Sequence, residues 1–326
     1  MAFQWLRRAG LLAACATALL LAACGGGSIV SSFVPTRVVA FGDAMGDLGQ
    51  NGQRYTINDG STNVWTQHVA NAYGRTLASS ATGGLSFATG NARVVATPDA
   101  AGNAGTPTVK QQIDAFLASS TLSAEDLVLV SAGTSDVIAQ AKAVMDGTIP
   151  EAVAQQNVQQ AADELAVQIR RLIAAGATHI AVAGPANLGR TPWAIQTGQG
   201  GLLGRLSLPA DQGSEIRGFN NRLLISLNGL GATVLYLDAA FEFNQATGSP
   251  SSFDLSDVST PVCTSVDPGP GIGTGAGQVN SNLCTPSTVV TGSDPNRFLW
   301  ADRVYPTPRG QRIFGDFAFN RIHERW

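Results

Sequence analysis

The chain has 326 residues, of which 44% are hydrophobic and only 13% are charged, and its formal net charge is −3. The scattered basic residues exclude a nucleic-acid-binding surface, and the high apolar content excludes a disordered chain. The 37 glycines follow no G-X-Y repeat, so they indicate turns and close backbone packing rather than collagen or a coiled coil.

The first residues of the chain have the pattern of a secretory signal. Arg7 and Arg8 precede an apolar run from residue 11 to residue 21, and small residues follow the run. The run is shorter than the roughly 20 residues that a membrane-spanning helix needs. The pattern therefore indicates export from the cytoplasm rather than a membrane span.

The residues that end this run indicate a lipid anchor. Leu21-Ala22-Ala23-Cys24 resembles the lipobox of bacterial lipoproteins, in which the cysteine becomes the lipidated first residue. The resemblance implies a signal peptide over residues 1–23 and a lipid-anchor tether over residues 24–36. Gly25 after the cysteine favours the outer membrane, so we expect a cell-envelope protein that faces the periplasm or the exterior. An ordinary signal peptide with a chance cysteine is the alternative.

Strands and helices alternate along the rest of the chain. Short apolar runs that end in Gly, Pro or Asp are typical of buried parallel strands, and they occupy Arg37–Gly42, Asp126–Ala132, His179–Gly184 and Thr233–Asp238. Helical patterns occupy Asn63–Tyr73, Thr108–Leu117, Glu151–Gly176, Asp211–Leu227 and Pro308–Arg321. This order predicts one α/β domain over residues 37–326, with a parallel sheet covered by helices on both faces. In such a sheet, the functional loops follow the carboxyl ends of the strands.

Two cysteines, Cys263 and Cys284, remain in the exported part of the chain besides Cys24. An exported protein meets an oxidising compartment, so we expect a disulfide between them, with two free thiols as the alternative. A metal site is not supported, because neither has a His or Cys neighbour at ligand spacing. The segment from Asn244 to Arg297 is rich in Gly, Pro, Ser and Thr, which predicts a flexible excursion near the mouth of the cleft.

Four blocks of residues carry a resemblance to a known family. They are Phe41-Gly42-Asp43-Ala44-Met45-Gly46-Asp47-Leu48-Gly49, Ser86-Phe87-Ala88-Thr89-Gly90-Asn91-Ala92, Gly133-Thr134-Ser135-Asp136 and Asp302-Arg303-Val304-Tyr305-Pro306-Thr307. They resemble, in this order, the conserved blocks of the GDSL esterases and lipases, the SGNH hydrolases. The segments 185–192 and 219–220 resemble segments of the bacterial branch of this family, which carries extra loops. The resemblance implies a three-layer α/β/α sandwich with a central parallel sheet, the flavodoxin-like SGNH hydrolase fold.

The family's reacting side chains are missing from these blocks. In the family, a Ser is the nucleophile, a His is its base, and an Asn helps to stabilise the oxyanion. This chain has Ala44 at the nucleophile position, Tyr305 at the base position and Ser135 at the Asn position. Gly90, at the other oxyanion position, and Asp302, the acid that orients the base, match the family. The framework residues that also match are Asp43, Asp47 and Asp136.

These replacements predict the loss of serine-type ester hydrolysis. The Ala44 methyl group cannot form an acyl-enzyme, and losing the nucleophile or the base can cost on the order of a millionfold in rate. The phenol of Tyr305 has an ordinary pKa near 10, which makes it a poor base at neutral pH. We expect an inactive family member that binds an acyl, ester or glycan ligand in the retained cleft or acts as an envelope scaffold. No cofactor and no nucleic acid are expected, and protein partners stay open.

The rival hypothesis is an active ester hydrolase with a rearranged catalytic set. The three histidines, His68, His179 and His323, are predicted to lie away from the cleft. None of the candidate hydroxyls sits in a strand–turn–helix elbow beside a histidine; these are Ser80, Ser86 and Ser131. An engineered Ser→Ala exchange is a further alternative for position 44, but it leaves positions 135 and 305 unexplained.

Overall fold

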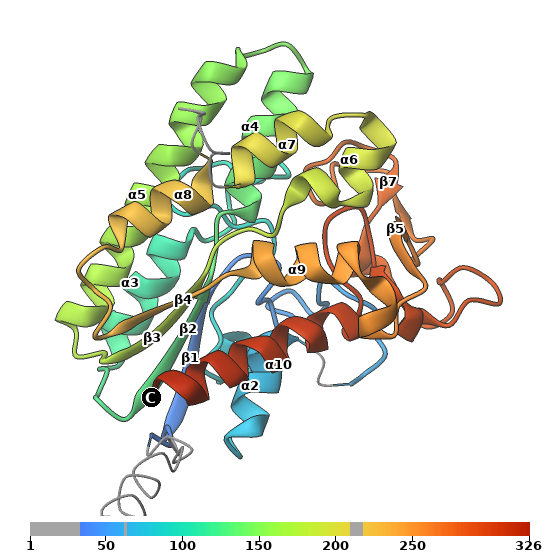
Figure 1. Ribbon diagram of the computed structural model, residues 1–326. Coiled ribbons are helices and arrows are strands. Elements are labelled where there is room, and N and C mark those ends of the chain that lie inside the picture. The colour runs from blue at the N-terminus through green and yellow to red at the C-terminus, as the bar shows by residue number, and fades with distance from the viewer. Residues whose placement is uncertain (1–32, 62–63, 209–217) are drawn as a thin grey trace, which may run out of the picture. The chain divides into compact units, whose positions relative to one another are not determined.

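The central sheet consists of four parallel strands in the order β1-β2-β3-β4 (Figure 1). The strands are β1 (Arg37–Gly42), β2 (Asp126–Ser131), β3 (His179–Ala183) and β4 (Val234–Leu237). This computed structural model describes residues 33–61, 64–208 and 218–326. The predicted signal peptide, Cys24 and most of the tether lie outside these residues. The four predicted strands are confirmed to within one residue at each end.

Both faces of the sheet are buried, which explains why the strands read as apolar runs. Alternate residues of one strand point to opposite faces. Val39 and Phe41 of β1 join one apolar cluster, whereas Val38 and Ala40 join the other. The fold is therefore an α/β/α sandwich, as the resemblance implies.

Two sets of helices cover the two faces (Figure 1). One set comprises α3 (Val109–Ser119), α4 (Thr134–Met145), α5 (Glu151–Ala174), α6 (Pro192–Thr197), α7 (Gly200–Ser207) and α8 (Phe219–Ser226). The other set comprises α2 (Trp65–Ala72), α9 (Ala239–Gly248) and α10 (Pro308–Arg325). The sequence predicts α2, α3, α5, α8 and α10, but not α4, α6, α7 and α9; residues 211–217 of the helix predicted over 211–227 lie outside the described residues. Within the described residues, no helix is long and apolar enough to span a membrane.

The segment between α9 and α10 differs from its prediction as a flexible excursion. It carries the strands β5 (Asp257–Pro261), β6 (Val266–Asp267), β7 (Gln278–Val279) and β8 (Phe298–Trp300). β5 pairs with β8, and β6 pairs with β7. A small apolar cluster lies beneath them and includes Val262, Ala301 and Ile57 from the far end of the chain. Very short paired strands hold this segment together. They are too short to show a regular apolar period, so the sequence pattern does not reveal its structure.

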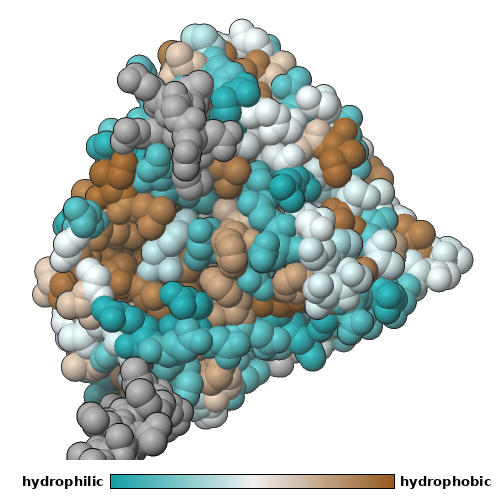
Figure 2. Space-filling view, viewed as in Figure 1, coloured by the Kyte–Doolittle hydropathy of each residue, from teal (hydrophilic) through white to brown (hydrophobic). Residues whose placement is uncertain are grey.

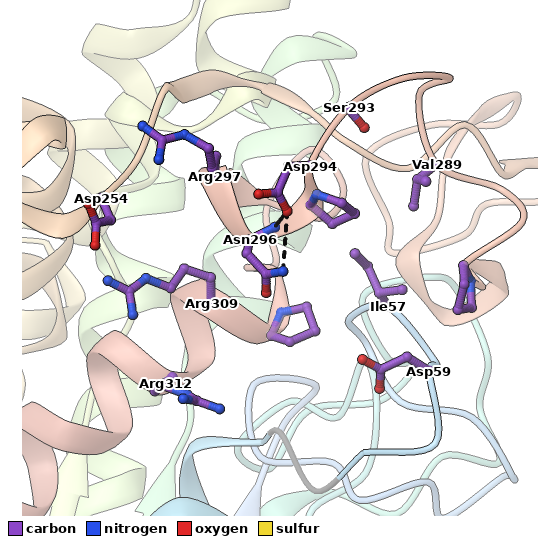
Figure 3. A pocket seen from close by; sticks show the side chains of 13 residues that line it. Ile57, Asp59, Asp254, Val289, Ser293, Asp294, Asn296, Arg297, Arg309 and Arg312 are labelled. Carbon is purple, nitrogen blue, oxygen red and sulfur yellow. Dashed lines mark hydrogen bonds between the residues drawn. The ribbon is translucent and has the colours of Figure 1, made fainter.

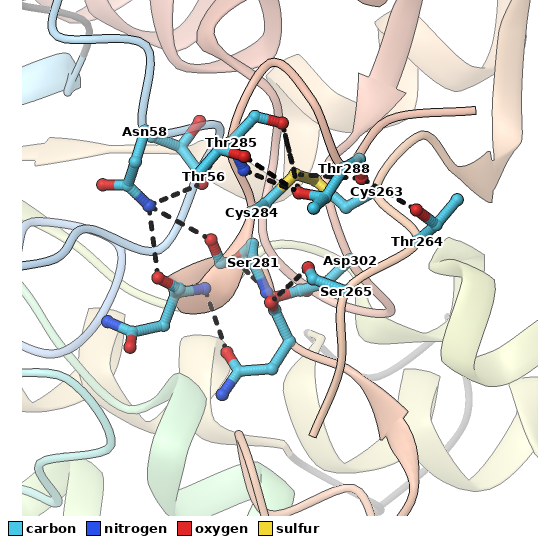
Figure 4. Close-up of a disulfide and its surroundings, with 12 residues drawn as sticks. Thr56, Asn58, Cys263, Thr264, Ser265, Ser281, Cys284, Thr285, Thr288 and Asp302 are labelled. Carbon is cyan, nitrogen blue, oxygen red and sulfur yellow. Dashed lines mark hydrogen bonds between the residues drawn. A yellow bond between two sulfur atoms is a disulfide. The ribbon is translucent and has the colours of Figure 1, made fainter. Parts of the chain in front are cut away.

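Cys263 and Cys284 form a disulfide within this segment, with their Cα atoms 5.9 Å apart (Figure 4). Both cysteines are buried in the same small apolar cluster. The pairing is the one expected from the sequence. The disulfide lies close to the carboxyl edge of the sheet. Ser281 is three residues before Cys284, and both its amide and its hydroxyl donate to the carboxylate of Asp302 at that edge.

Candidate functional site

The family blocks meet at the carboxyl edge of the sheet. The loop after β1 carries Ala44, the loop after β2 leads to Ser135 in the first turn of α4, and the loop before α10 carries Tyr305. Ala44 and Tyr305 pack in one apolar cluster, and Asp43 and Ser135 lie close enough to Tyr305 to act on its pKa. The structure thus brings together the positions that the resemblance assigns to one centre.

Close backbone contact explains the glycine that ends β1. A Cβ atom on Gly42, whose φ is +147°, would lie 2.0 Å from the carbonyl oxygen of Ser131 on β2. The peptide of Gly42 also exchanges two hydrogen bonds with the side chain of Gln112 on α3. Only glycine fits there, and the first loop leaves the sheet in a fixed direction.

Asp43 ties the first loop to the third block. Its fully buried carboxylate accepts hydrogen bonds from the backbone amides of Met45 and Thr134, each at 3.1 Å. Burial raises the pKa of Asp43 to about 7, although these two amides oppose the rise. The residue holds two loops together and takes no part in any contact with a histidine.

Asp47 occupies the backbone amide that the family resemblance assigns to the oxyanion. The Gly90 amide donates a 2.7 Å hydrogen bond to Oδ2 of Asp47, while Oδ1 accepts from the amides of Gly49 and Gln50. Burial raises the pKa of Asp47 to about 6. Gly90 is therefore already bonded within the protein.

Asp136 and Asp302 are likewise buried carboxylates that hold loops. Asp136 accepts from the Val94 amide at 3.0 Å and pairs with Arg93 at 3.2 Å, and burial raises its pKa to about 6. Asp302 accepts from the amides of Val304 and Tyr305 and from Ser281 (Figure 4). Burial raises its pKa as well. Asp302 binds the backbone where the family would have it orient a histidine.

The three replaced positions are closed to solvent. Ala44 and Tyr305 are each 1% exposed, and Ser135 is 0% exposed. The hydroxyls of Ser135 and Tyr305 make no hydrogen bond of ordinary geometry among the described residues, although Ser135 lies close enough to Tyr305 to oppose the rise of its pKa. Burial and the nearby carboxylates of Asp43 and Asp302 raise the pKa of Tyr305, so the phenol is an even weaker base than free tyrosine.

Tyr55 fills the space between the oxyanion and base positions. A Cβ atom on Gly90 would lie 2.0 Å from the ring of Tyr55, so the ring rests directly on that glycine. The same ring meets Tyr305 edge to face, with a centroid distance of 5.5 Å. Two aromatic rings therefore cover the centre that a substrate ester would have to enter.

The cavity beside Tyr305 is small. It is lined by Ser131, Thr134 and Tyr305, among others, and its volume is about 20 Å³. That volume has room for about one water molecule, whereas small-molecule pockets measure roughly 300–1,000 Å³. This cavity cannot hold an acyl chain or a sugar.

Comparison with known proteins places these features in a family. The model of the GDSL-like lipase/acylhydrolase family matches residues 38–317, which is most of the chain. The chain belongs to the GDSL-like lipase/acylhydrolase family. The resemblance noted in the sequence is thus confirmed.

Curated relatives of the GDSL-like chain match it over shorter stretches. Esterase EstA of Pseudomonas aeruginosa and that of Pseudomonas putida are each 28% identical over 118 residues, covering 35% of this chain and 16% of theirs. An uncharacterised protein of the trpE–trpG intergenic region in Pseudomonas putida is 29% identical over 164 residues, covering 50% and 24%. The chain thus spans less than a quarter of the length of these relatives.

The extra segments of the bacterial GDSL branch also lie together. The Asn220 amide group donates a 2.8 Å hydrogen bond to the Pro185 carbonyl, and the ring of Phe219 lies where a Cβ atom on Gly133 would be. A Cβ atom on Gly184 would lie 2.0 Å from Asn220 Oδ1. These contacts show that two segments far apart in the sequence pack against each other.

The histidines of this GDSL-family member lie away from the centre, as predicted. His68 is on α2, where Arg312 and Asp316 of α10 act on its pKa. His179 begins β3 at the amino edge of the sheet, where its ring stacks on Phe33 and its Nδ1 contacts the hydroxyl of Thr178. The ring of His323, near the end of α10, stacks on Phe319.

The candidate hydroxyls find no base either. Ser131, at the end of β2, and Ser86, beside β1, are buried without a side-chain hydrogen bond, and Ser80 binds the amide of Gln50. Within the described residues, no group of three or more His, Cys, Asp or Glu side chains could hold a metal ion.

Tyr55 is the residue of this centre that the sequence analysis misses. It lies eight residues after Asp47, in a stretch without a family motif, and its contact with Gly90 depends on the path of the intervening loop. One sequence signal could have pointed to Tyr55. It is an aromatic residue shortly after the first block, which has no nucleophile, and such a residue can fill the space that a substrate would use.

Proposed function

We propose that this chain is a GDSL-family protein that no longer hydrolyses esters and acts in the cell envelope by binding or scaffolding. The observation that carries the proposal is the closure of the family centre. Tyr305 is 1% exposed at the base position and packs against Tyr55, which in turn covers Gly90. Any ligand would have to bind elsewhere on the surface.

The chemistry of the remaining residues supports this proposal. Acyl transfer needs a nucleophile, a base within hydrogen-bond reach and an oxyanion donor. Ala44 offers a methyl group in place of a nucleophile, and Tyr305 is buried with a raised pKa in place of a base. The nucleophile and the base are both replaced, so a small movement of one loop would not restore hydrolysis.

The name of Esterase EstA supports the rival hypothesis of an active ester hydrolase with a rearranged catalytic set. This chain would share the activity of such a relative only if it also had the reacting side chains. The one described contact between a histidine ring nitrogen and a hydroxyl, that of His179 with Thr178, lies at the opposite edge of the sheet. The geometry therefore favours the inactive member.

The envelope location rests on Cys24, which lies outside the described residues. Phe33, at the start of the described chain, stacks on His179 at the amino edge of the sheet. A lipid on Cys24 would hold the protein at the membrane surface. This location suits a protein that meets its ligand or partner in the periplasm or outside the cell.

An ester-hydrolysis assay tests the proposal. The full-length Cys24→Ala protein, purified without detergent, is mixed with p-nitrophenyl esters of short and of long acyl chains. We expect rates equal to those of buffer alone. Turnover that saturates with ester and scales with protein would refute the loss of hydrolysis and favour the rearranged catalytic set.

A further inference from the structure

A pocket of about 740 Å³ lies apart from the family centre. It lies between the start of α10 and the segment that joins α9 to α10. Its lining includes Ile57, Val289, Arg297, Arg309 and Arg312. Figure 3 shows the three guanidinium groups on one side of the pocket, with Ile57 and Val289 on the opposite side. The volume matches that of pockets for small molecules.

Two of these guanidinium groups are exposed to solvent and have no partner among the described residues. Among the residues that the structure describes, Arg297 and Arg312 are the arginines whose side chains make no hydrogen bond or ion pair. The other described arginines bind a carboxylate, a carbonyl or a side-chain oxygen; Arg309, for example, donates to the Phe253 carbonyl at 2.8 Å. Both unpartnered arginines line the same pocket.

The position of Arg312 adds a second sign of unbalanced positive charge. Arg309 and Arg312 are three residues apart in the first turns of α10, so they lie on one face of the helix. Burial is the main cause of the lowered pKa of His68 on α2, and the positive charge of Arg312 lowers it further, against the opposing charge of Asp316. Figure 2 shows the surface over α10 as a hydrophilic band. An anion bound here would offset this local repulsion.

The acidic residues of the pocket differ in whether they are engaged. The Asp294 carboxylate accepts from Asn296, and the Asp59 carboxylate accepts from the Ser61 amide, so both stabilise their own loops. The Asp254 carboxylate makes no hydrogen bond among the described residues, and its backbone has a φ of +57°. The pocket therefore offers two free cationic donors and one free anionic acceptor.

We infer that this pocket binds a small saccharide that carries an anionic group. Arg297 and Arg312 would bind the carboxylate or phosphate oxygens, because guanidinium groups match both in charge and geometry. Asp254 would accept hydrogen bonds from sugar hydroxyls, which a simple anion lacks. Ile57 and Val289 would pack against the less polar face of the ring. The inference does not depend on the loss of hydrolysis.

Calorimetric titration of the purified full-length protein tests this inference. The probes are D-galacturonate and D-glucose 6-phosphate, each beside its neutral counterpart, D-galactose and D-glucose. We expect saturable binding of at least one anionic sugar and binding at least about tenfold weaker for its neutral counterpart. The preference between the two anions identifies the source as a carboxylated or a phosphorylated sugar.

Matched variants locate the binding. Arg297→Ala and Arg312→Ala should each weaken binding of the anionic sugar about tenfold, and added salt should weaken it further. Arg321→Ala, on the same helix but outside the pocket, is the control and should bind as the unchanged protein does. Asp254→Asn, which tolerates the positive φ, should weaken binding severalfold.

Several results would overturn the inference. These are equal binding of neutral and anionic sugars, no saturable binding of either anion below about 10 mM, or unchanged binding by both arginine variants. Inorganic phosphate that binds as tightly as D-glucose 6-phosphate, or Asp254→Asn that binds more tightly, would refute recognition of a saccharide. None of these outcomes bears on ester hydrolysis, which a separate assay measures.

Discussion

The ring of Tyr55 meets the ring of Tyr305 edge to face, with an interplanar angle of 65° and a centroid distance of 5.5 Å. Tyr305 occupies the position of the catalytic base in the GDSL family, and Tyr55 rests on Gly90 at the oxyanion position. Edge-to-face pairs of this kind are worth about 1 kcal/mol beyond the area they bury. The pair thus makes the family centre part of the protein's core.

The hydroxyl of Tyr305 is expected to cost stability. It is buried without a hydrogen bond of ordinary geometry, with only the Ser135 hydroxyl near enough to act on it, and a buried polar group without a full partner is unfavourable by about 1 kcal/mol or more. Tyr305→Phe should therefore raise the free energy of unfolding by about 1 kcal/mol in urea denaturation. Tyr305→Ala should lower it by about 3–5 kcal/mol, because it leaves a cavity. A less stable Tyr305→Phe protein would show that the hydroxyl is satisfied.

Stability should fall as the pH rises from about 4 to about 7. The pKa values of Asp43, Asp47 and Asp136 are raised by burial to about 7, 6 and 6, so the folded protein binds more protons than the unfolded chain in this range. Each such carboxyl lowers the free energy of unfolding by at most about 1.4 kcal/mol per pH unit. The lowered pKa values of His68 and His179 act in the opposite sense near pH 6.

The variant Asp43→Asn measures how much Asp43 contributes to the dependence of stability on pH. Asparagine cannot titrate, so the variant's profile should be flatter between pH 5 and pH 7 in urea denaturation. Carboxylates with lowered pKa values, such as Asp126 and Asp163, lose their contribution only in more acidic solution. Parallel profiles for the variant and the unchanged protein would contradict the raised pKa of Asp43.

Removing the disulfide should destabilise the protein by about 3 kcal/mol. Cys263 and Cys284 are 21 residues apart, and a loop of that size gives about this value in the chain-entropy model. The double variant Cys263→Ala with Cys284→Ala should also loosen Ser281, which binds Asp302. Denaturation under non-reducing conditions measures the first effect. Mass spectrometry that finds two free thiols in the exported protein would rule out the bridge.

The lipid anchor remains a prediction from residues 21–24. Export of the full chain should yield a membrane-bound protein whose first residue is a diacylated Cys24. Cys24→Ala should move the protein to the soluble fraction and remove the lipid mass. Membrane fractionation with intact-protein mass spectrometry checks both. A Cys24→Ala protein that stays with the membrane at unchanged mass would point to a different attachment.

Local patterns predict most of this fold and only part of its site. The strands are recognisable because burial on both faces leaves uninterrupted apolar runs, and α5 because Val158, Leu165, Ile169 and Leu172 recur at helical spacing. α7 begins with two glycines and α4 begins inside a family block that resembles a loop, so neither shows a clear pattern.

Contacts between distant segments are what the sequence does not reveal. Family blocks predict that Ala44, Ser135 and Tyr305 meet, but not that Tyr55 covers them. Likewise, Arg297 and Arg312 come from separate segments, and only the folded chain shows that both lack partners in one pocket. Such contacts depend on loop paths, and no periodic pattern encodes these.

Restoring the missing side chains should create weak activity, because the loops still bring positions 44, 135 and 305 to one edge of the sheet. Ala44→Ser with Tyr305→His should create measurable turnover of a small activated ester, and Ala44→Ser alone should not, since the serine would lack a base. Adding Ser135→Asn should gain up to about 3 kcal/mol in transition-state stabilisation. Tyr55→Ala should raise turnover in the repaired protein by opening access, but should have no effect on the unrepaired one.

Labelling with a fluorophosphonate probe tests most directly whether the GDSL centre has lost its chemistry. The probe reacts with an activated serine, so it needs no guess about the natural substrate. We predict no labelling of the unchanged protein and labelling at residue 44 in the variant that carries Ala44→Ser, Tyr305→His and Tyr55→Ala. Labelling of the unchanged protein at any serine would contradict the account and identify the nucleophile outside the first block.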